Sequence, residues 1–490
     1  RASADQMTQP FRLSFPTTRA GRISRSAVIT VVALSGLFPS VTRGADTEPN
    51  GHRLQAMGPP SGLSAPERGY WLLTNKPYLP PDFDHATFDN LWQIWPAEER
   101  EAARNADPQE RRRLTFARYG LVEPPESDGT GPALGYLSDG GDGWVMNCLA
   151  CHGGKVAGEG MAGLPNSRFA MQTLVEDVST LKLLQLKPLA HLDKAATGIP
   201  LSTTDGTTNS VVFGIVLGAL RNPDMSVDTT RPIPELVHHD MDPPPFWNVK
   251  KKTRLYIDGF APKTARPLLQ FMLIPRNDRE TILSWEQDYE DVLAWIESVE
   301  PPEYPWEIDH GLAREGERVF NANCAECHGA YGEHETYPER TVPISVVGTD
   351  PVRLEALTPA HRKWMKIGWM SRFGEDEVEL DPGGYVAPPL DGIWASAPYF
   401  HNGSVPTLWH VLHPDERPVV WRRTEHGYDR DRTGLEVTEF AELPDSVNAP
   451  RERRRYFDTR LTGKSAAGHL FPNELNENQR RAVLEYLKTL

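Results

Sequence analysis

The chain has 490 residues, of which 39% are hydrophobic and 24% charged, a composition typical of a globular protein rather than a disordered one. Its net charge of −15 argues against nucleic acid or anionic lipid as a partner and suits electrostatic attraction of a small basic redox protein. The length allows about two to four domains, and 44 prolines and 39 glycines predict long irregular segments between short helices.

Residues 1–45 have the pattern of a leader. Arg19, Arg22 and Arg25 precede the apolar run AVITVVALSGLF, which is followed by TRGA. The apolar run is shorter than the roughly 20 residues that span a bilayer, which disfavours the alternatives of a membrane anchor or a buried helix. We therefore predict a signal peptide, no membrane span after its cleavage, and a periplasmic or secreted protein.

Residues 46–300 form the predicted N-terminal domain. It contains the sequence MNCLACHGGK at 146–155 and an insertion, residues 195–280, that is rich in proline and turn signals. The domain closes at 289–299, where apolar residues at i, i+3, i+4 and i+7 predict one buried face of a helix. These residues are Val292, Trp295, Ile296 and Val299.

Residues 301–308 are the predicted linker, because Pro301, Pro302 and Pro305 prevent the helix from continuing. The C-terminal domain, 309–490, begins with a predicted helix in which Gly316 permits close approach of another helix. It continues with NANCAECHGA at 321–330 and ends with a helix whose start carries a capping-box pattern at Asn476 and Gln479. The apolar face of that last helix comprises Val483, Tyr486, Leu487 and Leu490. The expected fold is mainly α, with two cytochrome c-like haem domains and long irregular loops.

The four cysteines occur as two C-x-x-C-H units, and none is left over. A disulfide within each unit would leave the histidines unexplained, and a zinc site would need an unusually long gap between its cysteine pairs. Covalent attachment of haem accounts for all six residues, because two thiols bind the haem vinyl groups and the adjacent histidine ligates the iron. The sequence therefore predicts two haem c groups, held by Cys148, Cys151 and His152 and by Cys324, Cys327 and His328.

The sixth iron ligands are less evident. His469 is the candidate for the second haem, since it lies in a loop shortly before the last helix. Competing candidates are His401, Met365 and Met370. For the first haem His191, His238 and His239 are available, yet none stands out, so we expect an open site.

The stretch YVAPPLDGIWASAPYFHNGSVPTLWHVL, residues 385–412, resembles a conserved-looking stretch of the bacterial di-haem cytochrome c peroxidase superfamily. Together with the ending GHLFPNELNENQRRAVLEYLKTL and the segment RGYWLLTNKPYLPPDFDHATFDNLW, it is most similar to the rubber-oxygenase-like branch. The resemblance implies that His152 and His328 are proximal ligands and that His469 is the distal ligand of the second haem. It also implies that dioxygen or peroxide binds at the first haem near Phe246 or Phe260, with Trp247 as an electron-transfer bridge.

The resemblance further implies a haem-dependent oxidoreductase that acts on an apolar alkene, if it is oxygenase-like, or on hydrogen peroxide, if it is peroxidase-like. A calcium ion between the domains is common among the peroxidase relatives, and no loop of this sequence can be assigned to it. The alternative function is a di-haem electron carrier in which both irons have six ligands, with the acidic surface as its docking face.

Overall fold

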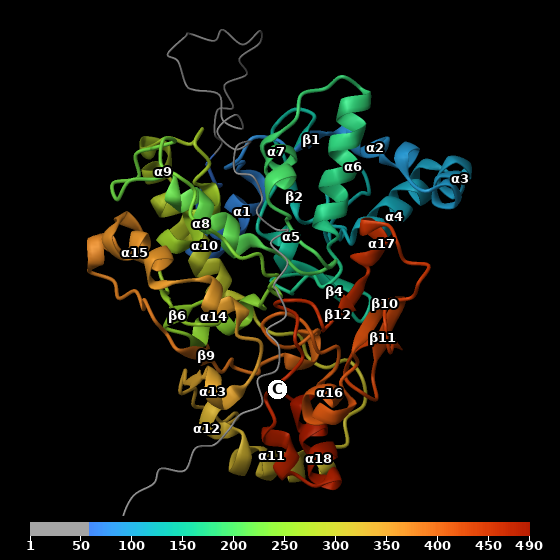
Figure 1. Cartoon of the computed structure of the whole chain (residues 1–490), viewed down its shortest axis with the longest axis vertical. Helices are drawn as coiled ribbons and strands as arrows, with labels where there is room; N and C mark the ends of the chain where they lie inside the picture. The colour runs from blue at the N-terminus through green and yellow to red at the C-terminus, as the bar shows by residue number, and fades with distance from the viewer. Residues whose placement is uncertain (1–57) are drawn as a thin grey trace, which may run out of the picture.

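The structure is a computed structural model that describes residues 58–490. The predicted signal peptide and its cleavage site lie outside the described residues. No helix of the described part has the length and apolar character that crossing a bilayer would require. The elements of the first half gather at one end of the molecule, whereas helices α11 and α18 form the opposite end (Figure 1).

The described part of the first half, from residue 58 on, contains ten α-helices, three short 3-10 helices and seven strands. The α-helices are α1 (Ala65–Asn75), α2 (His85–Asp89), α3 (Ala97–Asn105), α4 (Pro108–Tyr119), α5 (Leu149–His152), α6 (Met171–Leu184), α7 (His191–Gly198), α8 (Ser210–Ala219), α9 (Arg279–Ser284) and α10 (Glu286–Ser298). The 3-10 helices are η2 (Leu91–Ile94), η3 (Phe246–Lys251) and η4 (Arg266–Met272). The strands are β1 (Phe83–Asp84), β2 (Tyr136–Ser138), β3 (Gly143–Met146), β4 (Gly153–Val156), β5 (Glu159–Ala162), β6 (Arg254–Leu255) and β7 (Ala261–Pro262).

The second half contains the remaining helices and strands. The helices are α11 (His310–Asn323), α12 (Ala325–His328), α13 (Ile344–Val347), α14 (Val352–Ala356), α15 (Pro359–Ile367), η5 (Trp369–Gly374), η6 (Ile393–Ala395), α16 (Leu408–Leu412), η7 (Pro414–Glu416), α17 (Pro450–Arg453), η8 (Phe471–Glu474) and α18 (Glu477–Leu487). The strands are β8 (Thr341–Pro343), β9 (Gly384–Val386), β10 (Val420–Asp429), β11 (Gly434–Phe440) and β12 (Tyr456–Asp458).

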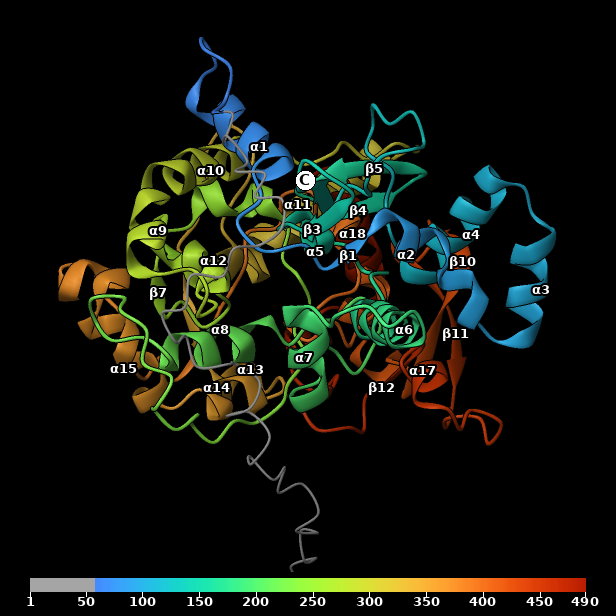
Figure 2. The same ribbon diagram turned by 90° about the horizontal axis from the view of Figure 1, so that it is seen from above.

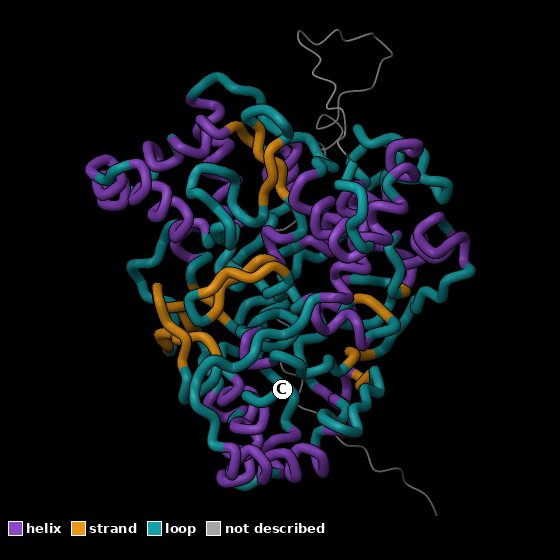
Figure 3. Tube along the Cα trace, turned by 180° about the vertical axis from the view of Figure 1, so that it is seen from behind, coloured by secondary structure: helices purple, strands orange, loops and turns teal. Residues whose placement is uncertain are grey.

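The strands make two three-stranded antiparallel sheets, in the orders β1-β3-β2 and β11-β10-β12, and the pairs β4-β5, β6-β7 and β8-β9. Of the described residues 42% are helical and 13% are in strands or bridges, so the prediction of a mainly α fold is only partly correct. The hairpin β10-β11 is the largest element that was not predicted. Its sequence alternates apolar and charged residues only over short stretches, so it lacks the pattern that marks a strand. Loops fill much of the middle of the molecule, as Figure 3 shows.

Each half contains one pair of tightly packed helices. Helix α1 packs against α10, which is evident in Figure 2, and α11 packs against α18. The three helices predicted from periodicity are α10, α11 and α18, and the capping box of α18 at Asn476 and Gln479 is confirmed. Gly69 in α1 and Gly316 in α11 sit directly against the backbone of the partner helix. The two halves therefore share the same type of helix crossing.

The predicted linker connects α10 to α11 without a helix or strand. Its aromatic side chains are nevertheless packed, because Tyr304 contacts Trp394 edge to face with ring centroids 5.3 Å apart. Trp306 stacks on Tyr428 at 4.9 Å. These contacts hold the segment between the halves against the second half.

Candidate functional site

The first C-x-x-C-H unit lies at helix α5, between strands β3 and β4. Cys148 and Cys151 are unpaired and half-buried, and burial raises the pKa of their thiols to about 11 and about 12. Cys148 borders a small pocket of about 10 Å³, together with Tyr78, Met272 and Tyr289. Both thiols are thus protonated and pack against apolar clusters, surroundings that suit a hydrophobic group.

His152 is held in one orientation. Its Nδ1 lies 2.9 Å from the carbonyl oxygen of Pro244, and because a carbonyl only accepts, Nδ1 carries the hydrogen and Nε2 keeps a free lone pair. Burial lowers the pKa of His152 to about 4, so the imidazole is neutral at physiological pH. A neutral imidazole whose other nitrogen donates to a backbone carbonyl is the typical form of a metal-ligating histidine.

The second unit repeats this arrangement. His328 is the last residue of helix α12, and its Nδ1 donates to the carbonyl oxygen of Pro388 at 2.9 Å. Burial lowers the pKa of His328 as well. Cys324 and Cys327 are unpaired and half-buried, and burial raises the pKa of the Cys324 thiol to about 11.

The structure brings His469 to His328. Their ring centroids are 6.3 Å apart, with an interplanar angle of 63°. Two imidazoles that bind one metal from opposite sides, each through a bond of about 2.0–2.1 Å, have centroids about 6 Å apart. The residues at the second site therefore fit a haem iron between the two rings, and His328, His469, Cys324 and Cys327 are the residues that would hold it.

The loop that carries His469 is fixed by backbone contacts. The His469 amide donates to the carbonyl of Val347 at 2.6 Å, and Arg417 donates to the carbonyls of Ala466 and Gly468, both at 2.7 Å. His469 has φ of 48°, a left-handed conformation that is uncommon for a residue other than glycine. Backbone strain of this kind persists where the surrounding structure demands it, often at functional sites.

The three predicted aromatic residues lie in different surroundings. Phe246 stacks on the ring of His152, with centroids 4.2 Å apart and an angle of 22°, so it contacts the imidazole itself. Phe260 stacks on Tyr256 at 4.8 Å, in an apolar cluster that also contains Met272. Met272 borders the pocket at Cys148, but Phe260 does not; its ring instead lies under the guanidinium groups of Arg353 and Arg362, at 5.9 and 5.6 Å.

Trp247 is fully buried and links the two sites. Its Nε1 donates to the carbonyl of Asp391 at 2.6 Å, and the side-chain amide of Asn248 donates to the carbonyl of Pro389 at 3.1 Å. These bonds join the segment that holds His152, through Pro244, to the segment that holds His328, through Pro388. Both acceptor prolines lie in short proline runs, DPPPFW and APPLDG, a local repeat that is visible in the sequence.

The competing ligands have other contacts. Both ring nitrogens of His238 have hydrogen-bond partners, Asp240 at 2.7 Å and Asn209 at 2.8 Å. Met365 and Met370 are buried in the same apolar cluster as Phe260, which agrees with core packing. The remaining histidines also contact protein groups: His191 lies 3.7 Å from Asp82, His239 donates to Val237, and His401 packs on Tyr385. Within residues 58–490 no group of three or more His, Cys, Asp or Glu side chains could hold a metal ion, so the two cysteine pairs do not form one zinc site.

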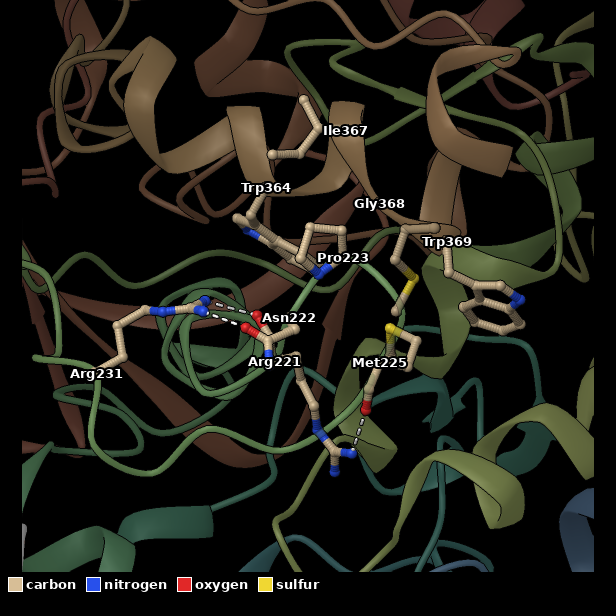
Figure 4. A pocket seen from close by; sticks show the side chains of 10 residues that line it. Arg221, Asn222, Pro223, Met225, Arg231, Trp364, Ile367, Gly368 and Trp369 are labelled. Carbon is tan, nitrogen blue, oxygen red and sulfur yellow. Dashed lines mark hydrogen bonds between the residues drawn. The ribbon is translucent and has the colours of Figure 1, made fainter.

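A second pocket, of about 60 Å³, lies between α15 and the loop after α8 (Figure 4). Its two arginines are already engaged: Arg231 donates to Asn222, and Arg221 donates to Met225 and to the carbonyl of Leu273. Of the candidate iron ligands it contains only Met370, which is buried in the apolar core, and it contains no residue of either C-x-x-C-H unit. We therefore assign it no part in the site.

The comparisons with known proteins agree with a cytochrome. Residues 384–422 match the family described as RoxA-like, cytochrome c-like, which supports covalently bound haem c and oxidoreductase chemistry in general. This segment includes Pro388, the acceptor for His328, and Phe400, whose ring centroid is 6.0 Å from that of His469.

Two relatives come from Sinorhizobium fredii, and both are described as uncharacterized proteins. The protein y4iM is 30% identical over 203 residues, which cover 36% of this chain and 45% of the relative. The protein y4iJ is 38% identical over 119 residues, which cover 22% of this chain and 18% of the relative. The chain thus spans less than half the length of either relative.

Proposed function

We propose that this chain is an exported di-haem c-type oxidoreductase, with dioxygen or hydrogen peroxide activated at the N-terminal site and electrons relayed through the C-terminal site. The observation that carries this proposal is the pair His328 and His469, whose rings are spaced as two axial ligands of one iron would be. His152 likewise donates from Nδ1 to a prolyl carbonyl, that of Pro244, which supports a second haem at the N-terminal site.

The two sites differ in the groups that face their C-x-x-C-H histidines, as expected if one site activates dioxygen or peroxide and the other relays electrons. His469 faces His328, whereas the ring of His152 is covered by Phe246 and its Nε2 remains available for an iron. No described contact brings a second histidine or methionine to His152. This asymmetry supports an open first site and a closed second site.

The bound haems would supply the chemistry of dioxygen or peroxide and the electron storage. The protein orients the proximal imidazoles through Pro244 and Pro388, and Phe246 covers the ring of His152 with an apolar surface. It also joins the two sites through Trp247, whose indole reaches the Asp391 carbonyl. The repeated helix crossings support two cytochrome c-like domains, residues 46–300 and 309–490, with 301–308 between them.

The proposed substrate depends on whether the protein is oxygenase-like or peroxidase-like. An oxygenase-like protein would attack an apolar alkene at a double bond, and a peroxidase-like protein would reduce peroxide with electrons from a small redox protein. The match at residues 384–422 favours the first. Turnover of peroxide with a reduced donor, in the absence of stable dioxygen binding, would select the second.

Low-temperature EPR of the purified ferric protein, together with haem quantification and intact mass, tests the proposal. We expect two haems per chain, one low-spin signal, and a second signal that changes when imidazole or azide is added. Two low-spin haems that resist added ligands in both oxidation states would favour the alternative function, a di-haem electron carrier. Purified protein without haem would contradict both functions.

A further inference from the structure

Two buried arginines share one carboxylate beside the second site. Arg353, on helix α14, is 1% exposed and lies 3.3 Å from Asp258 Oδ1, while Arg362 lies 2.9 Å from Asp258 Oδ2. Two guanidinium groups facing one carboxylate leave an excess positive charge in the interior. A buried charge without a counter-charge is strongly destabilising, so this cluster requires another anion.

Arg353 has the donors for such an anion. Its Nε and Nη1 are buried and have no hydrogen-bond partner in the described structure. Arg362 is more fully engaged, because its Nη1 donates to the carbonyls of Leu357 and Leu380. An unsatisfied buried donor is destabilising, and more so when it is charged, so an acceptor that the polypeptide does not provide is expected at Arg353.

The neighbouring groups do not supply that acceptor. The titratable groups facing Arg353 are Asp258, Arg362, Tyr256, Tyr385, His239 and His401. Burial and the charge of Arg353 lower the pKa of His239 to about 4 and of His401 to about 3, so both are neutral. The buried carboxylate of Asp350 accepts from the amides of Val352 and Ser465 and makes no hydrogen bond to Arg353 in the described structure, so it leaves the Arg353 donors unpaired.

The cluster also adjoins the second site. Tyr385 lies three residues before Pro388, the acceptor for His328, and its ring centroid is 4.4 Å from that of His401. The preceding residue, Phe400, contacts His469 with centroids 6.0 Å apart. Tyr385 and His401 therefore link Arg353 to Pro388, which accepts from His328, and to Phe400, which contacts His469.

We propose that Arg353 binds a carboxylate, and that this carboxylate is a propionate of the haem attached at Cys324 and Cys327. A haem c bound through its vinyl groups retains two carboxylates on the opposite edge, and an ionised carboxylate pairs with a guanidinium in a strong charge-assisted hydrogen bond. The inference rests on the proposed function, since it needs a haem at that site. Arg353 acts here as a positioning residue that also sets the charge around the iron.

The test compares the full-length haem protein with Arg353→Gln, which keeps a donor of similar size but removes the charge, and with Arg353→Lys, which keeps the charge. Arg231→Met, at the unrelated pocket in Figure 4, controls for loss of an arginine. The reduction equilibrium of each haem is measured by spectroelectrochemical titration between about pH 5 and pH 9.

Loss of a positive charge near the haem favours the oxidised form, which carries one more positive charge than the reduced form. For Arg353→Gln we expect the reduction equilibrium of the low-spin haem to shift about tenfold toward the oxidised form, or about 59 mV for one electron. We also expect a new pH dependence, because a propionate without its guanidinium partner takes up a proton more readily. Arg353→Lys and Arg231→Met should stay close to the wild type.

An unchanged potential in Arg353→Gln, with both haems present, would overturn the inference and leave the proposed function intact. If acetate added to the wild-type protein shifted the low-spin haem and Arg353→Gln abolished that response, a dissociable acid would occupy the site and the propionate assignment would be wrong. Absence of haem at Cys324 and Cys327 in the wild type would instead contradict the proposed function itself.

Discussion

The crossing of α11 and α18 depends on Gly316. A Cβ at this position would lie 1.9 Å from the carbonyl oxygen of Ala482 and 2.4 Å from its carbon, so the two helices would have to separate. Overpacking of this severity costs about 3 kcal/mol, while alanine recovers about 1 kcal/mol of helix propensity. Gly316→Ala should therefore destabilise the protein by about 2 kcal/mol, which lowers the Tm of a unit of this size by about 4–8 °C.

Thermal unfolding by calorimetry and circular dichroism measures this effect. Glu315→Ala, on the exposed face of the same helix, is the matched control and should change the Tm little. Gly69→Ala tests the other crossing, where the added Cβ would lie 2.0 Å from the Asp291 carbonyl oxygen. If the halves unfold separately, each variant should lower a different transition. A Gly316→Ala protein as stable as the Glu315→Ala control would refute this reasoning about the crossing.

His469→Ala should convert the low-spin haem into one that binds added imidazole, which an optical titration measures. The control His310→Ala, at an exposed position, should not have this effect. An unchanged spectrum in His469→Ala would exclude His469 as a ligand. Trp247→Phe removes the donor to the Asp391 carbonyl and should lower stability by about 1–3 kcal/mol in urea unfolding, so equal stability would argue against the link between the two sites. Burial raises the pKa of Asp82 to about 7, so between about pH 4 and pH 7 the folded protein holds a proton that the unfolded chain has lost, and stability falls as the pH rises through this window. Asp82→Asn cannot titrate and should flatten this slope in unfolding measured at several pH values; an unchanged slope would show that another group causes it.

Local patterns predicted the local elements of the fold. Periodic apolar residues identified α10, α11 and α18, and the capping residues Asn476 and Gln479 placed the start of α18. The expectation that Gly316 lies at a helix contact is confirmed by its position against Ala482. The hairpin β10-β11 was not predicted, because strand pairing depends on partners that no short window contains.

The sequence by itself determined which residues can attach haem, because thiol spacing and the adjacent histidine are covalent requirements that act over five residues. Only the tertiary structure decided which groups surround them. His469 lies more than a hundred residues from His328 in the chain, and its 6.3 Å approach depends on Arg417 and Val347 holding a loop in place. The sequence also could not predict the acceptors Pro244 and Pro388 or the unpaired donors of Arg353. Hydrogen-bond partners and buried charges depend on which chain segments packing brings together.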